Sequence, residues 1–243
     1  MLYQWRSVLE YLPDFLRAMG LTLWITLLAF ALALVCGLGA ALARNSKNAV
    51  LRLGAGAYVE IVRNTPVLLQ IFVVFFALPS FGLRMDAVTA GTVAIGVNVG
   101  GYLCEVFRAG ISSVARAQRE AAQVLGLSSR QAFISVIAPQ ALRNVYPATV
   151  NNLIQVLLGT SLLTAIAVPE LTGVATVINA RTLLFVQVFA IALVLYLVLS
   201  NALSFASGLL GRVLFKPPLE QVRPGLWPVR RARTITTTAE VAA

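Results

Sequence analysis

Residues 23–42 read LWITLLAFALALVCGLGAAL, a run of twenty residues without a charged side chain. A helix needs about 20 mostly apolar residues to cross the roughly 30 Å of hydrocarbon in a bilayer. The whole chain has the same character: 59% of its 243 residues are hydrophobic and 12% are charged, against about 25% charged in a soluble domain. The sequence therefore predicts an all-α, polytopic membrane protein and excludes an ordinary soluble enzyme or a disordered chain.

Four further stretches lack Asp, Glu, Lys and Arg, so the sequence predicts about five transmembrane helices. The five predicted spans cover residues 18–43, 64–83, 87–104, 144–169 and 182–211. The third, 87–104, is the weakest because it is rich in Gly, Ala and Val. Residues 1–19 carry four charged side chains and predict an amphipathic lead-in at the membrane surface, not a cleaved signal peptide. Residues 20–215 then form the membrane domain, and residues 216–243 form a basic, disordered cytoplasmic tail.

The basic residues predict the orientation of these helices. Three lie in the first predicted loop, five in the third and six in the tail, against four on the opposite side. Lys and Arg accumulate on the cytoplasmic side of membrane proteins, so we expect the N-terminus outside and the C-terminus in the cytoplasm. The net charge of +10 is then mostly a topology signal, and we expect no nucleic-acid partner.

The longest segment between predicted spans, residues 107–143, predicts two short helices. Apolar residues recur at a spacing of three to four over residues 111–125, as on one face of a helix. Gly126 follows as a helix stop, and Ser128 or Ser129 can cap a second helix over residues 130–137. Pro139 is expected to interrupt the chain before the fourth span begins.

Within this segment, Glu120-Ala121-Ala122, Gly126, Ile137 and Pro139 resemble the EAA loop of binding-protein-dependent ABC importer permeases. Further motifs resemble the polar-amino-acid branch of that family, and they are GLTLWIT (20–26), YVEIVRNTPVLLQ (58–70), EVFRAGI (105–111) and PQALR (139–143). The resemblance extends from about residue 15 to residue 215. Two departures are Ala117, where the family usually has Gly, and Leu158-Gly159, where many members have Lys. Because this chain lacks that Lys, no inference about substrate specificity can be drawn from it.

The resemblance implies a type I ABC importer permease in a bacterial inner membrane. Loop 112–140 would be a coupling helix, with Glu120, Ala121, Ala122, Gly126 and Pro139 meeting a groove of the ATP-hydrolysing subunit. The implied partners are a dimer of that ATPase, which holds ATP and Mg²⁺, a second copy or a paralogous permease, an extracytoplasmic amino-acid-binding protein, and membrane lipid. The chain itself would bind no cofactor and no metal. Taken alone, the loop also fits a plain amphipathic surface helix.

Polar residues inside the predicted spans are candidates for a substrate path, because polar groups in lipid usually face a bundle interior or a water-filled path. The candidates are Asn98, Asn151, Asn152, Gln155, Thr160 and Ser161, and we expect Asn151, Gln155 and Leu158 or Gly159 to share a helix face. The alternative is that these groups hydrogen-bond between helices. For Asn98 we favour helix packing, because Gly96 and Gly100 form a small-residue pattern around it.

Charged residues near the predicted spans offer two further hypotheses. Glu60 with Arg63 and Glu105 with Arg108 stand at helical i, i+3 spacing, and the two pairs together form either a cytoplasmic gate or brace, or ordinary interfacial ion pairs. Glu170 follows Pro169 at the predicted outer face. We expect it to be a solvated loop charge, with contact to a binding protein or a basic substrate as alternatives.

The function that these features predict is the membrane-spanning permease of an ATP-driven importer for polar or charged amino acids, working by alternating access. The sequence has no GxxxxGK[ST] motif, so we expect ATP to be hydrolysed by a separate subunit. One alternative is a self-sufficient channel or secondary carrier, but there is no visible inverted repeat. The other is an intramembrane enzyme, which the complete absence of His and of paired intramembrane carboxylates disfavours.

Overall fold

The structure is a computed structural model in which residues 2–215 are described, and the predicted tail, 216–243, lies outside the described residues. The described regular elements are all helical. They are α1 (Leu2–Leu9), α2 (Leu12–Arg44), α3 (Ala49–Arg63), α4 (Val67–Phe72), η1 (Val73–Ala77), η2 (Leu78–Phe81), α5 (Ala87–Ser112), α6 (Arg116–Val124), α7 (Ser129–Ala132), η3 (Phe133–Ile137), α8 (Ala138–Gly159), η4 (Thr160–Ile166), α9 (Leu171–Thr182) and α10 (Phe185–Leu214).

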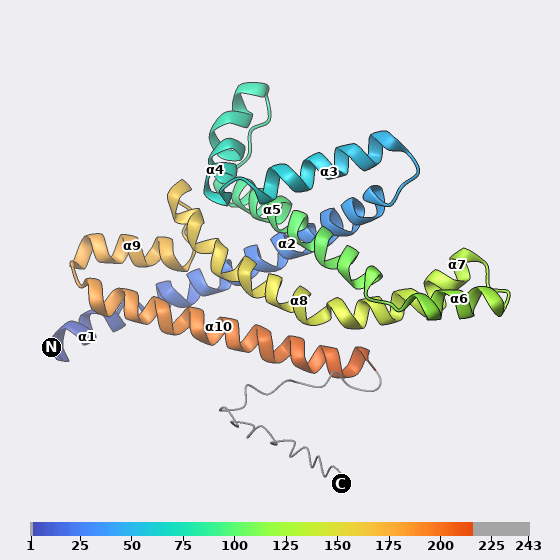
Figure 1. Ribbon diagram of the computed structural model, residues 1–243. Coiled ribbons are helices and arrows are strands. Elements are labelled where there is room, and N and C mark those ends of the chain that lie inside the picture. The colour runs from blue at the N-terminus through green and yellow to red at the C-terminus, as the bar shows by residue number, and fades with distance from the viewer. Residues whose placement is uncertain (1, 216–243) are drawn as a thin grey trace, which may run out of the picture.

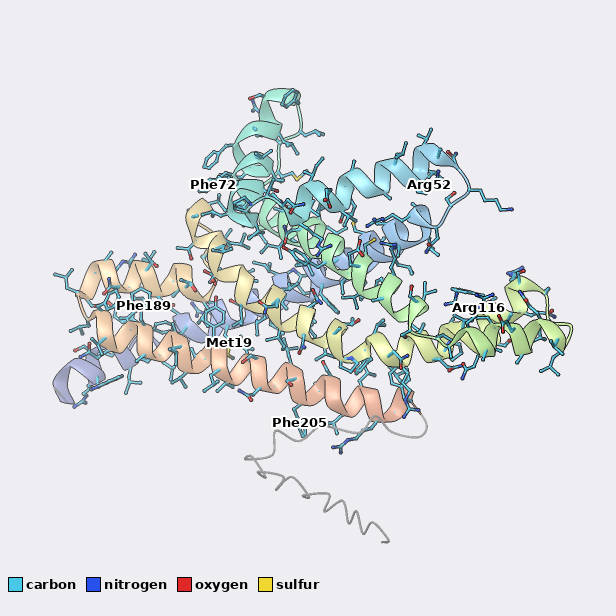
Figure 2. The ribbon with its side chains drawn as sticks, viewed as in Figure 1. Met19, Arg52, Phe72, Arg116, Phe189 and Phe205 are labelled. Atoms are coloured by element: carbon cyan, nitrogen blue, oxygen red, sulfur yellow. The ribbon has the colours of Figure 1, made fainter. Side chains whose placement is uncertain are left out.

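The long helices form a bundle in which α5 packs against α2 and α8, and α10 packs against α8 and α9. Figure 1 shows α6 and α7 extending from one end of this bundle and α9 closing the other. Side chains project from both ends, with Arg116 near the first and Phe189 near the second (Figure 2). The helix α2 begins at Leu12, so it already includes Asp14 and Arg17 from the predicted lead-in.

Four stretches of the described chain are long and apolar enough to cross a membrane: Leu12–Arg44, Ala87–Ser112, Ser129–Ile166 and Phe185–Leu214. A fifth arises if Ala49–Arg63 and Val67–Phe81 are counted as one broken span, since they meet at a bend of 108°. The second predicted span, 64–83, thus begins at this bend. Pro66 explains the break, because it cannot donate a backbone hydrogen bond and it disfavours the helical conformation of the residue before it.

Pro139 does not interrupt the fourth span, contrary to the prediction. It lies in the first turn of α8, and α7, η3 and α8 run on as one helical segment. The turn η3 is a π-helix in which the Ala138 N–H bonds to the Phe133 carbonyl, five residues earlier. A wider turn of this kind absorbs a residue that lacks an N–H and would crowd the preceding turn.

The loop between α5 and α8 has the predicted turn chemistry. Gly126 adopts a φ of 76°, its N–H bonds to Gln123 O at 2.9 Å, and the Leu127 N–H bonds to Ala122 O at 3.1 Å. This is a Schellman ending for α6. Ser128, rather than Ser129, caps the next helix in a capping box with Gln131. The first helix is shorter than predicted, because Ile111 and Ser112 belong to α5.

Small residues bring α2 and α5 together, as the sequence pattern predicts. A Cβ atom on Gly96 would stand 2.9 Å from the Ala29 carbonyl oxygen, and one on Gly100 would stand 2.7 Å from the Cys36 Cβ. Neither contact leaves room for a side chain. Larger residues then fill the core around this contact, with Ile25, Ile71, Leu103, Val156 and Leu163 fully or almost fully buried.

Candidate functional site

A cavity of about 640 Å³ opens between α4, α5, α8 and η4, and we call it the central cavity. Four of the predicted substrate-path residues border it, and they are Asn98, Asn152, Gln155 and Ser161. The helix face was predicted one residue out of place, because Asn152 rather than Asn151 shares the cavity with Gln155, Leu158 and Gly159. Asn151 is exposed outside it.

Thr160 is also absent from the lining of the central cavity. It is fully buried, and its hydroxyl donates to Leu157 O at 2.7 Å. The volume of the central cavity lies within the range of about 300–1,000 Å³ that small-molecule sites occupy. Its lining combines amide and hydroxyl groups with apolar walls from Val67, Ile95 and Leu162. Such a lining is suited to a small polar molecule.

One side of the central cavity is built on the bend between α3 and α4. The Val62 carbonyl would normally accept the N–H four residues on, but residue 66 is a proline and has none. Two side-chain amides supply donors instead: Asn98 Nδ2 at 2.9 Å and Gln70 Nε2 at 3.0 Å. Asn98 Nδ2 also donates to Gln70 Oε1 at 3.1 Å. Asn98 therefore borders the cavity and holds two helices together.

Gln70 also donates to Thr65 Oγ1 at 2.7 Å, so it bridges the two sides of the bend. This role of Gln70 is not evident from the residues that precede and follow it in the sequence. The sequence does contain one indication of it. Pro66 leaves the Val62 carbonyl without its usual backbone donor, and a buried backbone group without a partner is rare, so a side-chain donor could have been expected there.

The predicted four-charge group is only partly assembled. Glu105 pairs with Arg108 at 3.1 Å and also with Arg44, which sequence analysis did not include. In the described part of the chain, neither Glu60 nor Arg63 has an ion pair. The reason is that α3 buries Val59 and Val62, which leaves Glu60 and Arg63 exposed. Arg63 instead lies over the Tyr102 ring, 5.5 Å from its centroid.

The loop with the EAA motif projects from the end of the bundle (Figure 1). Glu120 and Arg116 form an exposed ion pair with an Nε–Oε1 distance of 2.7 Å. Ala121 and Pro139 are exposed, whereas Ala122 is buried. The tip of the loop presents bare apolar surface, with Val124 88% and Leu125 79% exposed. Exposed apolar residues of this size next to charges are typical of a protein-binding surface.

Two hydrogen bonds connect this loop to the helices that line the central cavity. The Arg119 guanidinium donates to the Ile111 carbonyl at the end of α5. Asn144 Nδ2 on α8 donates to the Ser113 hydroxyl that follows α5, at 2.8 Å. The loop is thereby fixed to both α5 and α8.

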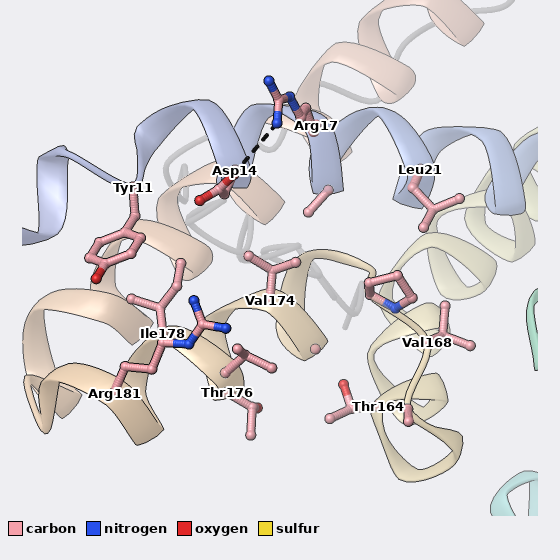
Figure 3. Close-up of a pocket in the computed structure, with 15 residues that line it drawn as sticks. Tyr11, Asp14, Arg17, Leu21, Thr164, Val168, Val174, Thr176, Ile178 and Arg181 are labelled. Carbon is pink, nitrogen blue, oxygen red and sulfur yellow. Dashed lines mark ion pairs between the residues drawn. The ribbon is translucent and has the colours of Figure 1, made fainter.

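A second cavity, of about 680 Å³, lies between the start of α2 and α9 at the other end of the bundle, and we call it the lateral cavity. Figure 3 shows Asp14 and Arg17 on α2 and Arg181 on α9, together with Thr164 of η4. Asp14 and Arg17 form an exposed ion pair at 3.8 Å. The remaining wall is mostly apolar, with Leu21, Val174 and Ile178.

Glu170 contradicts the prediction of a solvated loop charge, because it is fully buried. It caps α9 by accepting from the Thr172 N–H at 3.0 Å and the Gly173 N–H at 2.7 Å. The Thr164 and Tyr196 hydroxyls also donate to it, at 2.8 and 2.7 Å. Buried polar groups are tolerated when they are fully hydrogen-bonded. The sequence did not show that Tyr196, 26 residues away, would supply a donor.

Comparison with known proteins places these features in a family. Residues 33–212 match the family described as binding-protein-dependent transport system inner membrane component. The glutamine transport system permease protein GlnP of Escherichia coli (strain K12) is 35% identical over 207 residues, which cover 84% of this chain and 94% of that protein. The probable amino-acid ABC transporter permease protein YckA of Bacillus subtilis (strain 168) is 33% identical over 195 residues, which cover 80% of this chain and 86% of that protein.

Solved structures show the same architecture. The crystal structure of an amino acid ABC transporter with histidines contains a chain that is 33% identical, with a TM-score of 0.81 over 86% of this chain and 98% of that chain. The MetNI methionine ABC transporter, in an inward-facing conformation, shares the fold at 20% identity and a TM-score of 0.69. The chain therefore belongs to the family of inner-membrane components of binding-protein-dependent transport systems, and it is a transport subunit with multiple membrane spans.

Proposed function

We propose that this chain is the permease subunit of an ATP-driven importer for polar or charged amino acids, and that the amino acid crosses the membrane through the central cavity. The observation that carries the proposal is the lining of the cavity, where Asn98, Asn152, Gln155 and Ser161 converge. The similar proteins are named as permeases for glutamine and for L-cystine, and the similar crystal structure is that of an amino acid transporter with histidines.

The chemistry of the lining fits a zwitterion. No Asp, Glu, Lys or Arg of the described chain lines the central cavity, so an α-ammonium and an α-carboxylate would be held by neutral groups that both donate and accept. Asn98 directs its amide nitrogen to Val62 and Gln70, which leaves its carbonyl oxygen as an acceptor for the ammonium. Gln155, on α8, offers amide donors to the carboxylate, and the Ser161 hydroxyl, which donates to Leu158 O at 2.7 Å, offers an acceptor.

The energy would come from a separate ATPase subunit that binds ATP and Mg²⁺ and docks on the loop 112–140. The exposed Glu120, Ala121, Val124 and Leu125 are the surface that meets it, and Gly126 and Pro139 shape the loop. Arg119 and Asn144 then transmit movement of the loop to α5 and α8, because their hydrogen bonds join the loop to both helices. Glu105, with Arg44 and Arg108, braces α2 against α5 at the same end.

We propose an orientation that this arrangement supports. The loop faces the cytoplasm, where ATP is found, and the end with α9 and the N-terminus faces outward, in agreement with the distribution of Lys and Arg. An external binding protein would deliver the amino acid at that end. The helix α10 exposes Leu193, Val194, Leu197 and Val198, a surface suited to lipid or to a second permease copy or paralogue.

A matched pair of substitutions on α8 tests the central cavity as the path. Gln155→Leu removes a polar group from the lining and lowers uptake about tenfold, since an unmatched polar partner weakens binding by about 1–3 kcal/mol. Asn151→Leu is the control, because Asn151 lies one turn away on the same helix but outside the cavity. The measurement is ATP-driven uptake of labelled L-glutamine, L-histidine and L-cystine into proteoliposomes that contain the permease, the ATPase and the binding protein. Equal uptake by both variants would refute the assignment of the cavity.

A further inference from the structure

The element η4 has an unusual conformation for a membrane span. It continues α8 as seven residues of 3₁₀-helix, Thr160–Ile166, although 3₁₀ runs longer than about four residues are uncommon because their hydrogen bonds are poorly aligned. It ends at Ala167, whose φ of 59° lies in the left-handed region that non-glycine residues avoid. Contacts from outside η4 must hold this segment in place.

The segment η4 also separates the two cavities. Ser161 and Leu162, near its start, line the central cavity. Thr164, three residues after Ser161, lines the lateral cavity. Any change in the helical geometry of η4 therefore alters the wall of the central cavity.

Glu170 supplies the outside contact. Its carboxylate accepts the Thr164 hydroxyl, the N–H groups of Thr172 and Gly173, and the Tyr196 hydroxyl, so it joins η4 to α9 and α10. The next residue extends the junction to α2, because the Leu171 N–H donates to Thr22 Oγ1 at 3.1 Å. The approach is tight, since a Cβ on Gly173 would stand 2.2 Å from the Val168 carbonyl oxygen.

We propose that η4 is a hinge in the fourth span and that Glu170 is the positioning residue that holds it in the extended 3₁₀ form. A 3₁₀-helix rises about 2.0 Å per residue and an α-helix about 1.5 Å. If the bond between Glu170 and Thr164 is released, η4 relaxes to the α form, shortens by about 0.5 Å per residue and turns Ser161 and Leu162 within the cavity wall. The consequence for transport rests on the proposed role of the central cavity, but the hinge itself does not.

The shortening can be measured between two exposed positions, one on α8 before the hinge and one near the end of η4. Spin labels are placed at Asn151→Cys on α8 and Ala165→Cys in η4, in a chain that carries Cys36→Ala and Cys104→Ala. Electron–electron distances are recorded in the assembled permease–ATPase complex in lipid nanodiscs. Thr164→Val removes the hydroxyl that binds Glu170 and keeps the size of the side chain. We expect this variant to produce a population in which the distance between the labels is shorter by about 3 Å. Six residues of η4 precede or carry the second label, and each rises about 0.5 Å less in the α form than in the 3₁₀ form.

Two controls separate the hinge from a general loss of stability. Thr176→Val removes a hydroxyl from the same lateral cavity without touching Glu170, since that hydroxyl donates to Thr172 O, and it should leave the distances unchanged. Thr164→Ser restores the hydroxyl and should restore the original distance.

The outcomes are distinct. A shorter population with Thr164→Val that is absent with Thr176→Val and Thr164→Ser supports the hinge. Identical distances for Thr164→Val and Thr176→Val in intact complex overturn it. A shorter population accompanied by an unchanged half-saturating amino-acid concentration for uptake would support the hinge and count against the central cavity as the path.

Discussion

The contact between α2 and α5 predicts how much stability is lost when a glycine on α2 is replaced by alanine. The prediction compares two glycines of that helix, Gly37 and Gly39. A Cβ atom on Gly37 would stand 2.7 Å from the Leu103 Cβ, 3.0 Å from the Gly100 carbonyl oxygen and 3.2 Å from the Cys104 nitrogen. A Cβ on Gly39, two residues along α2, would meet nothing within 4 Å. Both glycines gain about 0.8–1 kcal/mol of helix propensity on substitution by Ala. Only Gly37→Ala must also push two helix backbones apart.

The difference between the two variants isolates the packing contribution, because the propensity gain cancels. Overpacking of this kind destabilises a protein by about 1–3 kcal/mol, so Gly37→Ala should be less stable than Gly39→Ala by that amount. For a chain of this size, 1 kcal/mol shifts the midpoint of thermal unfolding by roughly 2–4 °C. The assay is thermal unfolding of both variants in one detergent at equal concentration, and the expected difference is roughly 2–12 °C. Equal midpoints would refute the close approach of α2 to α5 at Gly37.

Two further predictions concern the coupling loop and the start of α5. Gly126→Asn should retain the ATPase on co-purification, because Asn tolerates the left-handed conformation at this turn. Gly126→Val should lose most of the ATPase, because a β-branched residue does not tolerate that conformation. Equal retention of the ATPase by both variants would contradict the assignment of the turn. Asp86 caps α5 through Val88 and Thr89, and hydrogen bonds from Thr89 hold the pKa of this carboxyl below its ordinary value. Its stabilisation is therefore present above the unfolded pKa and is lost as pH falls through the folded pKa. The difference in melting temperature between the protein and Asp86→Asn should shrink on acidification, and a constant difference would refute the role of the charge.

The sequence predicted those features that depend on nearby residues. Charge-free runs located the spans because lipid excludes charge, and Gly126 with Ser128 located the turn chemistry of the loop because a glycine stop and a serine cap act within a few residues. The start of the second predicted span, 64–83, falls at the bend between α3 and α4, but the sequence analysis predicted no bend there. That bend depends on Gln70 and on Asn98, and the sequence does not tell which distant amide reaches the Val62 carbonyl.

Features that depend on distant partners were not predictable in the same way. Glu170 looks like a loop charge in the sequence because Pro169 precedes it, and only the packing of α9 against α10 brings Tyr196 to it. The ion pair of Glu105 with Arg44 requires α2 and α5 to meet, whereas Glu105 with Arg108 follows from helical spacing alone. The face of α8 was misplaced by one residue, because the helical repeat defines which residues share a face but not which face meets the cavity.

This chain is expected to move an amino acid only when a separate ATPase drives it. The most direct measurement is uptake of labelled L-glutamine, L-histidine and L-cystine into proteoliposomes that hold the permease alone, the permease with its ATPase, or the permease with its ATPase and binding protein, each with and without ATP. We expect uptake of at least one of these amino acids in the complete system with ATP, and no accumulation with the permease alone. Accumulation by the permease alone, driven by an ion gradient and indifferent to ATP, would contradict it and identify a secondary carrier.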